Sequence, residues 1–303
     1  MTTVIGMITA ENLTKRYHQH VAVNDVSFTC EPGTITGFLG PNGAGKSTTL
    51  RMLTGLTPPT AGRATIAGQS YAELPNPGRL VGVMLDAAAQ HPGRTGAETL
   101  RLSARLLNLP KNRAAEMLEL VGLGAAGKRR VGDYSLGMRQ RLGIGNALIG
   151  DPAVLVLDEP ANGMDPEGIR WMRELLRDFA ARGGTVLLSS HLLGEVQATV
   201  DRLVVIGSGR IVADGSLDDL LAGGRTTVRG LDPIALAQLL RAAGYAVEVG
   251  KHGALSVDAS AEQIGRLAAA SGQVLLELRD AGTAALEELF FSLTSQPAQV
   301  RAA

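Results

Sequence analysis

Short apolar runs alternate with amphipathic segments along the first two thirds of the chain. Four largely apolar runs are predicted strands: 34–39, 81–85, 154–157 and 185–188. The run 154–157 is wholly apolar, as expected for a strand that is buried on both faces. Between the last two runs, 169–182 has the spacing of an amphipathic helix. This alternation predicts an α/β core with a largely parallel sheet.

Several shorter patterns surround this core. Segments 8–17 and 21–30 are predicted strands on either side of a polar turn, and 64–67 is a shorter strand. The stretch 97–149 has helical apolar spacing and is predicted to form a helical insert. Further expected elements are a helix at 192–200 and a hairpin formed by 203–206 and 211–213.

A second, smaller unit is predicted beyond a glycine-containing linker at 222–224. Its strands and helices follow the order β-α-β-β-α-β, which matches a ferredoxin-like small α+β domain over 226–295. The predicted segments are 226–229, 233–243, 246–249, 255–257, 261–270 and 274–278, followed by a helix at 284–293. The last residues, 296–303, are expected to be frayed.

Composition restricts the function classes. The chain of 303 residues carries a formal net charge of +0 and only 3% aromatic residues, so neither its charge nor its aromatic content favours nucleic acid as a partner. The single cysteine, Cys30, allows no internal disulfide and is interpreted as a small buried residue. No apolar run approaches the roughly 18 residues of a membrane span, and no signal peptide is recognised, so direct membrane insertion is not expected.

A phosphate-binding loop follows the predicted strand 34–39. The residues Gly40, Pro41, Asn42, Gly43, Ala44, Gly45, Lys46, Ser47 and Thr48 fit the pattern G-x-x-x-x-G-K-[ST]. Glycines let successive backbone N–H groups point at phosphate oxygens, and the helix that follows adds a partial positive charge. Lys46 is expected to reach the β- and γ-phosphates of ATP, and the Ser47 hydroxyl to ligate Mg²⁺.

Two acidic residues follow the buried strand 154–157. An acidic residue at the tip of such a strand beside a phosphate loop is suited to hold Mg²⁺, which is the role predicted for Asp158. Glu159 is placed to polarise the attacking water. The other interpretation is a solvated carboxylate at a strand end.

The segment Tyr134–Arg141 carries the resemblance to a known family. It lies shortly before Asp158, where ATP-binding cassette (ABC) transporter nucleotide-binding subunits have their Leu-Ser-Gly-Gly-Gln signature. The first 220 residues or so resemble such a subunit. In the family, the positions of Ser135 and Gly137 meet the γ-phosphate that is bound by the opposite subunit. Leu136 and Met138 depart from the usual signature in a manner similar to the drug-exporter branch.

Other expected site residues follow from the resemblance. Tyr17 occupies the place of an aromatic that stacks on adenine, and His191 that of a histidine which contacts the γ-phosphate. Asp165 matches a residue in the loop that links the two nucleotide sites across the dimer. Asp86 stands where the family usually has a glutamine that helps to hold Mg²⁺ and senses the permease, and Gln90 is near but out of register. The remaining histidines lack metal-ligand spacing, so zinc is not expected.

The resemblance implies an ABC ATP-binding domain over 1–221, with an antiparallel β subdomain and a helical subdomain at about 97–149. It implies an ATPase that uses ATP and Mg²⁺, with Lys46, Glu159 and His191 in catalysis. Two cassettes, in a homodimer or a heterodimer, would close around two ATP molecules. They would drive a separate membrane permease, from the cytoplasmic face of the cell membrane, to export a drug or other small hydrophobic compound.

Two alternatives stay open at this point. One is a soluble ABC ATPase outside transport, although such proteins resemble tandem cassettes or have long coiled coils. The other is a phosphate-loop GTPase or kinase-like switch, which would not need Ser135 or His191.

Overall fold

A computed structural model of the chain describes residues 6–191, 194, 197–222, 226–250 and 253–279. Close contacts divide the chain into two compact units, with the division between Asp214 and Gly215. The first unit holds every residue of the expected nucleotide site. In the described part of the chain, no helix is both long enough and apolar enough to cross a bilayer.

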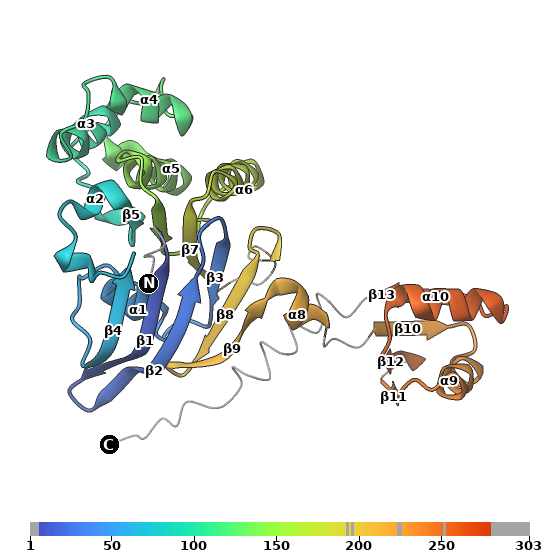
Figure 1. Cartoon of the computed structure of the whole chain (residues 1–303). Coiled ribbons are helices and arrows are strands. Elements are labelled where there is room, and N and C mark those ends of the chain that lie inside the picture. Colours follow the sequence, from blue (N-terminus) through green and yellow to red (C-terminus); the bar gives the residue numbers. More distant parts are fainter. Residues whose placement is uncertain (1–5, 192–193, 195–196, 223–225, 251–252, 280–303) are drawn as a thin grey trace, which may run out of the picture. The chain divides into compact units, whose positions relative to one another are not determined.

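The first unit is built on a six-stranded sheet (Figure 1). In spatial order, its strands are β5 (Val81–Met84), β6 (Val154–Leu157), β7 (Thr185–Ser190), β3 (Ile35–Leu39), β8 (Arg202–Gly207) and β9 (Arg210–Ser216). The pairings of β5 with β6, β6 with β7, β7 with β3, and β3 with β8 are all parallel. Only two residues join β8 to β9, as in a hairpin. The predicted parallel α/β core is confirmed.

Strand β3 lies inside this sheet, and all five of its residues are buried. Leu39, at its carboxyl end, pairs with Ser190 of β7, and the phosphate loop follows directly. Helix α1 (Lys46–Leu53) then leaves the loop. Because parallel strands end at the same edge of a sheet, the residues that follow β3, β6 and β7 meet there.

A separate antiparallel sheet has the order β2-β1-β4 and is made of β1 (Ile8–Tyr17), β2 (His20–Cys30) and β4 (Ala61–Ile66). Its apolar residues pack into one core with α1 and β3, where the rings of Phe28 and Phe38 stack with centroids 5.3 Å apart. This packing fixes the β1–β2 hairpin beside the phosphate loop. Tyr17 therefore lies near α1, although Lys46 comes 29 positions later in the sequence.

The helical insert contains α3 (Gly96–Leu106), α4 (Arg113–Leu120) and α5 (Leu136–Leu148). Thr95 caps α3 in a capping box with Glu98, through hydrogen bonds of 3.1 and 2.8 Å. Within the predicted helical stretch 97–149, the part up to residue 122 forms two helices, α3 and α4. The chain breaks at Asn108, whose φ of 52° is left-handed, and at Pro110, which cannot continue a helix.

Helix α6 (Pro166–Ala181) begins three residues before the predicted 169–182, because Asp165 caps it and Pro166 occupies the first turn. The short helices α2 (Pro77–Leu80) and α8 (Leu217–Ala222) were not expected from the pattern. In the described part of the chain, single 3₁₀ turns lie at Tyr71–Glu73, Ala87–Ala89 and Val131–Asp133. The helix predicted at 192–200 lies partly outside the described residues.

The described part of the second unit contains, after α8, the order β10 (Thr226–Gly230), α9 (Pro233–Ala242), β11 (Val247–Val249), β12 (Leu255–Val257), α10 (Ala261–Ala270) and β13 (Leu275–Arg279). Its four strands form an antiparallel sheet in the order β11-β12-β10-β13. A separate apolar core gathers around Val228, Leu236 and Leu240. The small α+β domain is thus present, with the element order of the ferredoxin-like motif. The predicted helix 284–293 and the tail 296–303 lie outside the described residues.

Candidate active site

The phosphate loop requires glycine at two crowded positions. A Cβ on Gly40 would lie 2.5 Å from the Ile206 carbonyl oxygen, and one on Gly45 would lie 2.7 Å from that of Ala22. Gly45 also has a φ of 109°, which side chains strongly disfavour. The loop therefore packs against β2 and β8 with bare backbone. Such a backbone turn at the start of a helix is suited to bind anions.

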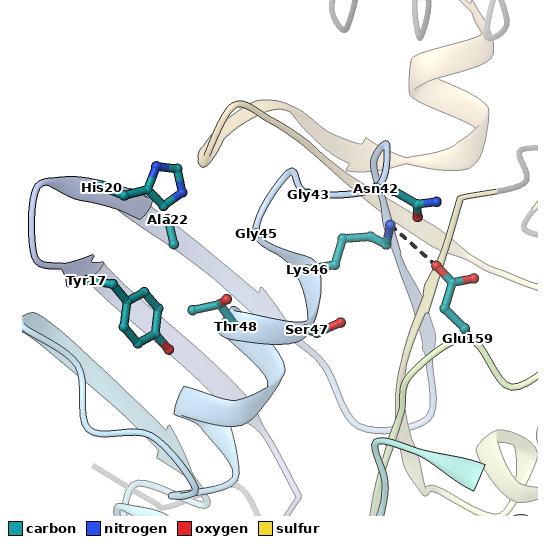
Figure 2. Close-up of a pocket in the computed structure, with 10 residues that line it drawn as sticks. All are labelled: Tyr17, His20, Ala22, Asn42, Gly43, Gly45, Lys46, Ser47, Thr48 and Glu159. Carbon is teal, nitrogen blue, oxygen red and sulfur yellow. Dashed lines mark ion pairs between the residues drawn. The ribbon is translucent and has the colours of Figure 1, made fainter. Parts of the chain in front are cut away.

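A cavity of about 390 Å³ opens over this loop (Figure 2). Its lining residues come from the β1–β2 hairpin, the loop, the start of α1 and the end of β6: Tyr17, His20, Ala22, Asn42, Gly43, Gly45, Lys46, Ser47, Thr48 and Glu159. Most of the predicted phosphate-binding residues thus share one cavity with Tyr17. Gly40, Pro41 and Ala44 belong to the same loop but are not among its lining residues.

Lys46 is the buried cation of the cavity. Its side chain is only 6% exposed, and its ammonium donates to the Gly40 carbonyl at 2.7 Å. Lys46 Nζ also lies 3.4 Å from Glu159 Oε1, as the dashed line in Figure 2 marks. The predicted phosphate-binding lysine and the predicted base therefore face each other.

Glu159 connects Lys46 to His191. Its second carboxylate oxygen, Oε2, lies 2.8 Å from His191 Nδ1. Its backbone has a left-handed φ of 49°, and its N–H donates to the Ser189 hydroxyl at 3.0 Å. Left-handed backbone is costly for a residue with a side chain, and strained residues of this kind cluster at functional sites. Glu159 therefore contacts both of the other residues predicted as catalytic, Lys46 and His191.

Asp158 is oriented by the neighbouring strands. Its N–H donates to the Met84 carbonyl of β5 at 2.7 Å, and its carboxylate accepts from the Ser189 hydroxyl. Ser47 lines the cavity. Mg²⁺ in nucleotide sites uses one or two protein oxygens besides phosphate oxygens and water. A serine hydroxyl in the cavity and a carboxylate next to Glu159 are a donor set of that kind.

The predicted signature segment lies elsewhere in the unit. Ser135 caps helix α5 by accepting a 3.2 Å hydrogen bond from the N–H of Met138, and it is exposed. Among the described residues, neither Ser135 nor Gly137 lines the cavity over the phosphate loop. Asp165 caps α6 by accepting from the N–H of Gly168 at 2.9 Å and likewise lies outside that cavity.

Asp86 lines a different cavity, of about 550 Å³, between the end of α1, β5 and the helical insert. Its described lining residues include Arg51, Asp86, Gln90, Arg94 and Leu102. Asp86 is not among the described residues that line the cavity of Lys46 and Glu159. Gln90 turns toward α5, where its side-chain amide donates to the Arg139 carbonyl at 3.4 Å.

Comparison with known proteins matches residues 23–162 to the family described as ABC transporter. The bacitracin transport ATP-binding protein of Bacillus licheniformis is 40% identical over 223 residues, which are 73% of this chain and 72% of that protein. The chain belongs to the ATP-binding proteins of the ABC transporter family. As a member of this family it is an ATPase, which decides against the GTPase-like alternative.

Other ABC proteins agree with this assignment. The Nod factor export ATP-binding protein I of Burkholderia orbicola is 37% identical over 254 residues, which are 81% of this chain and 84% of that protein. A solved ATP-binding subunit of an ABC transporter superposes with a TM-score of 0.65 at 29% identity, covering 71% of this chain and 91% of that one. Residues 224–287 match a domain of unknown function, DUF8746.

Three contributors to the ABC site were missed by the sequence reasoning. His20 lines the cavity because it pairs with Tyr17 across the β1–β2 turn, a relation that the two predicted strands already contained. Ser189 holds both Asp158 and the backbone of Glu159, and its place at the end of a strand beside His191 was a usable signal. Gln140 reaches the backbone of Glu159 from α5, and no short-range pattern reveals it.

Proposed function

We propose that this chain is the subunit that hydrolyses ATP to power a separate membrane permease, which exports a drug or other small hydrophobic compound. The observation that carries the proposal is the contact of Lys46, Glu159 and His191 over a glycine-rich phosphate loop. Support for export comes from the similarity to ATP-binding proteins named for bacitracin transport and Nod factor export. In this view, 1–221 is the ATP-binding domain and 226–295 is an accessory domain.

Each residue of the site then has a chemical role. Tyr17 stacks on adenine, and the amides of the loop hold the phosphates. The Lys46 ammonium leaves its pair with Glu159 for the β- and γ-phosphates, which frees the carboxylate to polarise water. His191 orients Glu159 through the 2.8 Å contact and contacts the γ-phosphate.

Mg²⁺ fits this arrangement. Ser47 and Asp158 are the residues that would hold it, while Asp86 would act from farther away, since it lines the second cavity. When bound, the cation neutralises charge that develops on the transferred phosphoryl group. The hydrogen bond from the Ser189 hydroxyl keeps the Asp158 carboxylate turned in one direction.

A second ABC subunit completes the site. Ser135 and Gly137 offer a helix N-terminus outside their own cavity, so they are available to the γ-phosphate of an opposite subunit. Asp165 would lie between the two nucleotides. Closure of the two subunits would exclude water, and hydrolysis would release them.

The second cavity supports a docking place for the permease. Polar groups such as Arg51 and Arg94 border it together with exposed apolar side chains, including Leu56 and Leu102. A partner helix with apolar and acidic side chains would suit this lining. The subunit would accordingly work as a peripheral protein on the cytoplasmic face of the cell membrane.

The test is an ATPase assay of the full chain in lipid vesicles with and without a candidate permease. We expect Mg²⁺-dependent ATP hydrolysis that rises when the permease is present, with ATP preferred over GTP. A chain that hydrolyses ATP equally well alone, and that never co-purifies with a polytopic membrane protein, would instead support a soluble ABC ATPase outside transport.

A further inference from the structure

Gln140 occupies an unusual position on helix α5. Its side chain is 5% exposed, and its amide nitrogen lies within hydrogen-bond distance of two backbone carbonyls, Asn162 O at 3.1 Å and Glu159 O at 3.4 Å. Both carbonyls belong to the loop that follows β6. One buried amide therefore joins the helix that Ser135 caps to the loop that carries Glu159.

The loop needs such support because Glu159 has a left-handed backbone. Its N–H is held by the Ser189 hydroxyl at 3.0 Å, and its carbonyl accepts from Gln140 and from the N–H of Asn162 at 3.1 Å. Held at both backbone groups, Glu159 can keep a φ of 49° that it would otherwise leave. The orientation of its carboxylate follows from this backbone.

A second contact connects the same two segments. Gly163 has a φ of 75°, and a Cβ there would clash with the side chain of Leu136. Leu136, which departs from the usual signature glycine, therefore packs closely on the loop after Glu159. Helix α5 therefore contacts this loop at two points: through Leu136, the first residue of the helix, and through Gln140, one turn later.

We infer that Gln140 is a positioning residue for Glu159: its buried amide ties the Glu159–Asn162 backbone to the signature helix α5, so that a shift of α5 moves the carboxylate. The inference rests on the proposed ATPase function. Ser135 caps α5, so a phosphate that binds there pulls on the helix that holds Glu159. Each subunit thereby senses, at its own carboxylate, the nucleotide of its partner.

The test compares the full-length chain with Gln140→Met, which keeps the size of the side chain and removes its donors. Gln140→Asn keeps the amide, but its side chain is one methylene shorter and should not reach the two carbonyls. This variant replaces Gln140→Met in the comparison if Gln140→Met folds poorly. We expect either change to lower kcat by about 10- to 100-fold, as for a displaced catalytic group, with nucleotide affinity nearly unchanged. Gln69→Met, on the exposed turn after β4, is the matched control and should retain wild-type turnover.

The decisive measurement repeats the substitutions in a Glu159→Gln background, with single-turnover hydrolysis as the readout. A residue that acts only by positioning the Glu159 carboxylate should have little further effect once that carboxylate is gone. Equal loss in both backgrounds, or wild-type kcat in the single variants, would overturn the inference. An inactive wild-type chain would instead count against the proposed function itself.

Discussion

The Lys46 ammonium lies 3.4 Å from the Glu159 carboxylate, so the two residues form an ion pair beside the phosphate loop. Lys46 also donates to the Gly40 carbonyl at 2.7 Å. A triphosphate must compete with both partners for the lysine. In the proposed function, binding of nucleotide and release of the Glu159 carboxylate to polarise water would thus be a single exchange of partners.

Replacing Glu159 by Gln should separate binding from hydrolysis. The amide cannot act as a base, so we expect turnover to fall at least about 100-fold. Nucleotide binding should persist, because the phosphates no longer compete with a charged carboxylate for the Lys46 ammonium. Turnover of the purified variant and titration with a fluorescent nucleotide check both expectations.

The control for this change is Glu174→Gln, on the exposed side of α6, which should hydrolyse ATP like the wild type. Near-normal turnover in Glu159→Gln would refute the assignment of the base.

Removal of the Lys46 ammonium should abolish nucleotide binding. The Lys46→Ala variant keeps the loop amides but loses the charge that reaches the phosphates, and it leaves the Glu159 carboxylate beside them without the lysine, in contact with His191. Equilibrium titration should detect no binding at micromolar nucleotide, whereas Lys128→Ala, exposed on the helical insert, should bind normally. Micromolar affinity in Lys46→Ala would count against the phosphate-loop interpretation.

Substitution of Gly163 by alanine should disturb the loop that follows Glu159. The new methyl group would clash with Leu136 and would also have to adopt a φ of 75°. We expect a lower melting temperature and a loss of ATPase activity. Adding Leu136→Ala removes the clash and should restore part of the stability, which thermal unfolding measures.

Gly183→Ala is the matched control for backbone strain. Gly183 has a φ of 91°, but a methyl group there would meet no described atom within 4 Å beyond its two chain neighbours. This variant should lose roughly 1 kcal/mol of stability from strain alone and keep its ATPase activity. If Gly163→Ala and Gly183→Ala lost ATPase activity equally, the contact between Gly163 and Leu136 would not contribute to function.

Cys30 should be inert in the folded protein. Complete burial raises the pKa of its thiol to about 12, against an ordinary value of 9.0, so almost none is thiolate at pH 8. We expect iodoacetamide to label the chain only after denaturation, as mass spectrometry can follow. The same shift predicts that stability declines as pH rises above about 9, since only the unfolded chain then ionises the thiol. Stoichiometric labelling of folded protein at pH 8 would contradict the buried position.

Much of the first unit was predictable because its signals are local. The run Val154–Leu157 is apolar throughout because the strand is buried on both faces. The glycines of the phosphate loop indicate a tight turn, and at Gly40 and Gly45 the neighbouring backbone leaves no room for a side chain. Cys30 was interpreted as a small buried residue, and this is confirmed. Lys46, Glu159 and His191 were named from motifs and flanks, and the fold brings them into contact.

The rest depends on contacts between distant segments. Two hydrogen bonds exist only because α5, β6 and β7 pack side by side: one from Gln140 to the Glu159 carbonyl, and one from the Ser189 hydroxyl to Asp158. Asp86 could be placed after its strand, but periodicity could not say which cavity its side chain would line. The break at Asn108 was hidden because apolar spacing continues through it.

The position of β3 in its sheet has a consequence for synthesis of the protein. Ile35 pairs with Val186, and Thr36 pairs with Arg202, so both neighbours of the strand that leads into the phosphate loop are translated long after it. A nascent chain that has emerged only as far as α5 contains the loop without the strands that hold it in place. We therefore expect the loop to bind nucleotide only once β7 and β8 have left the ribosome.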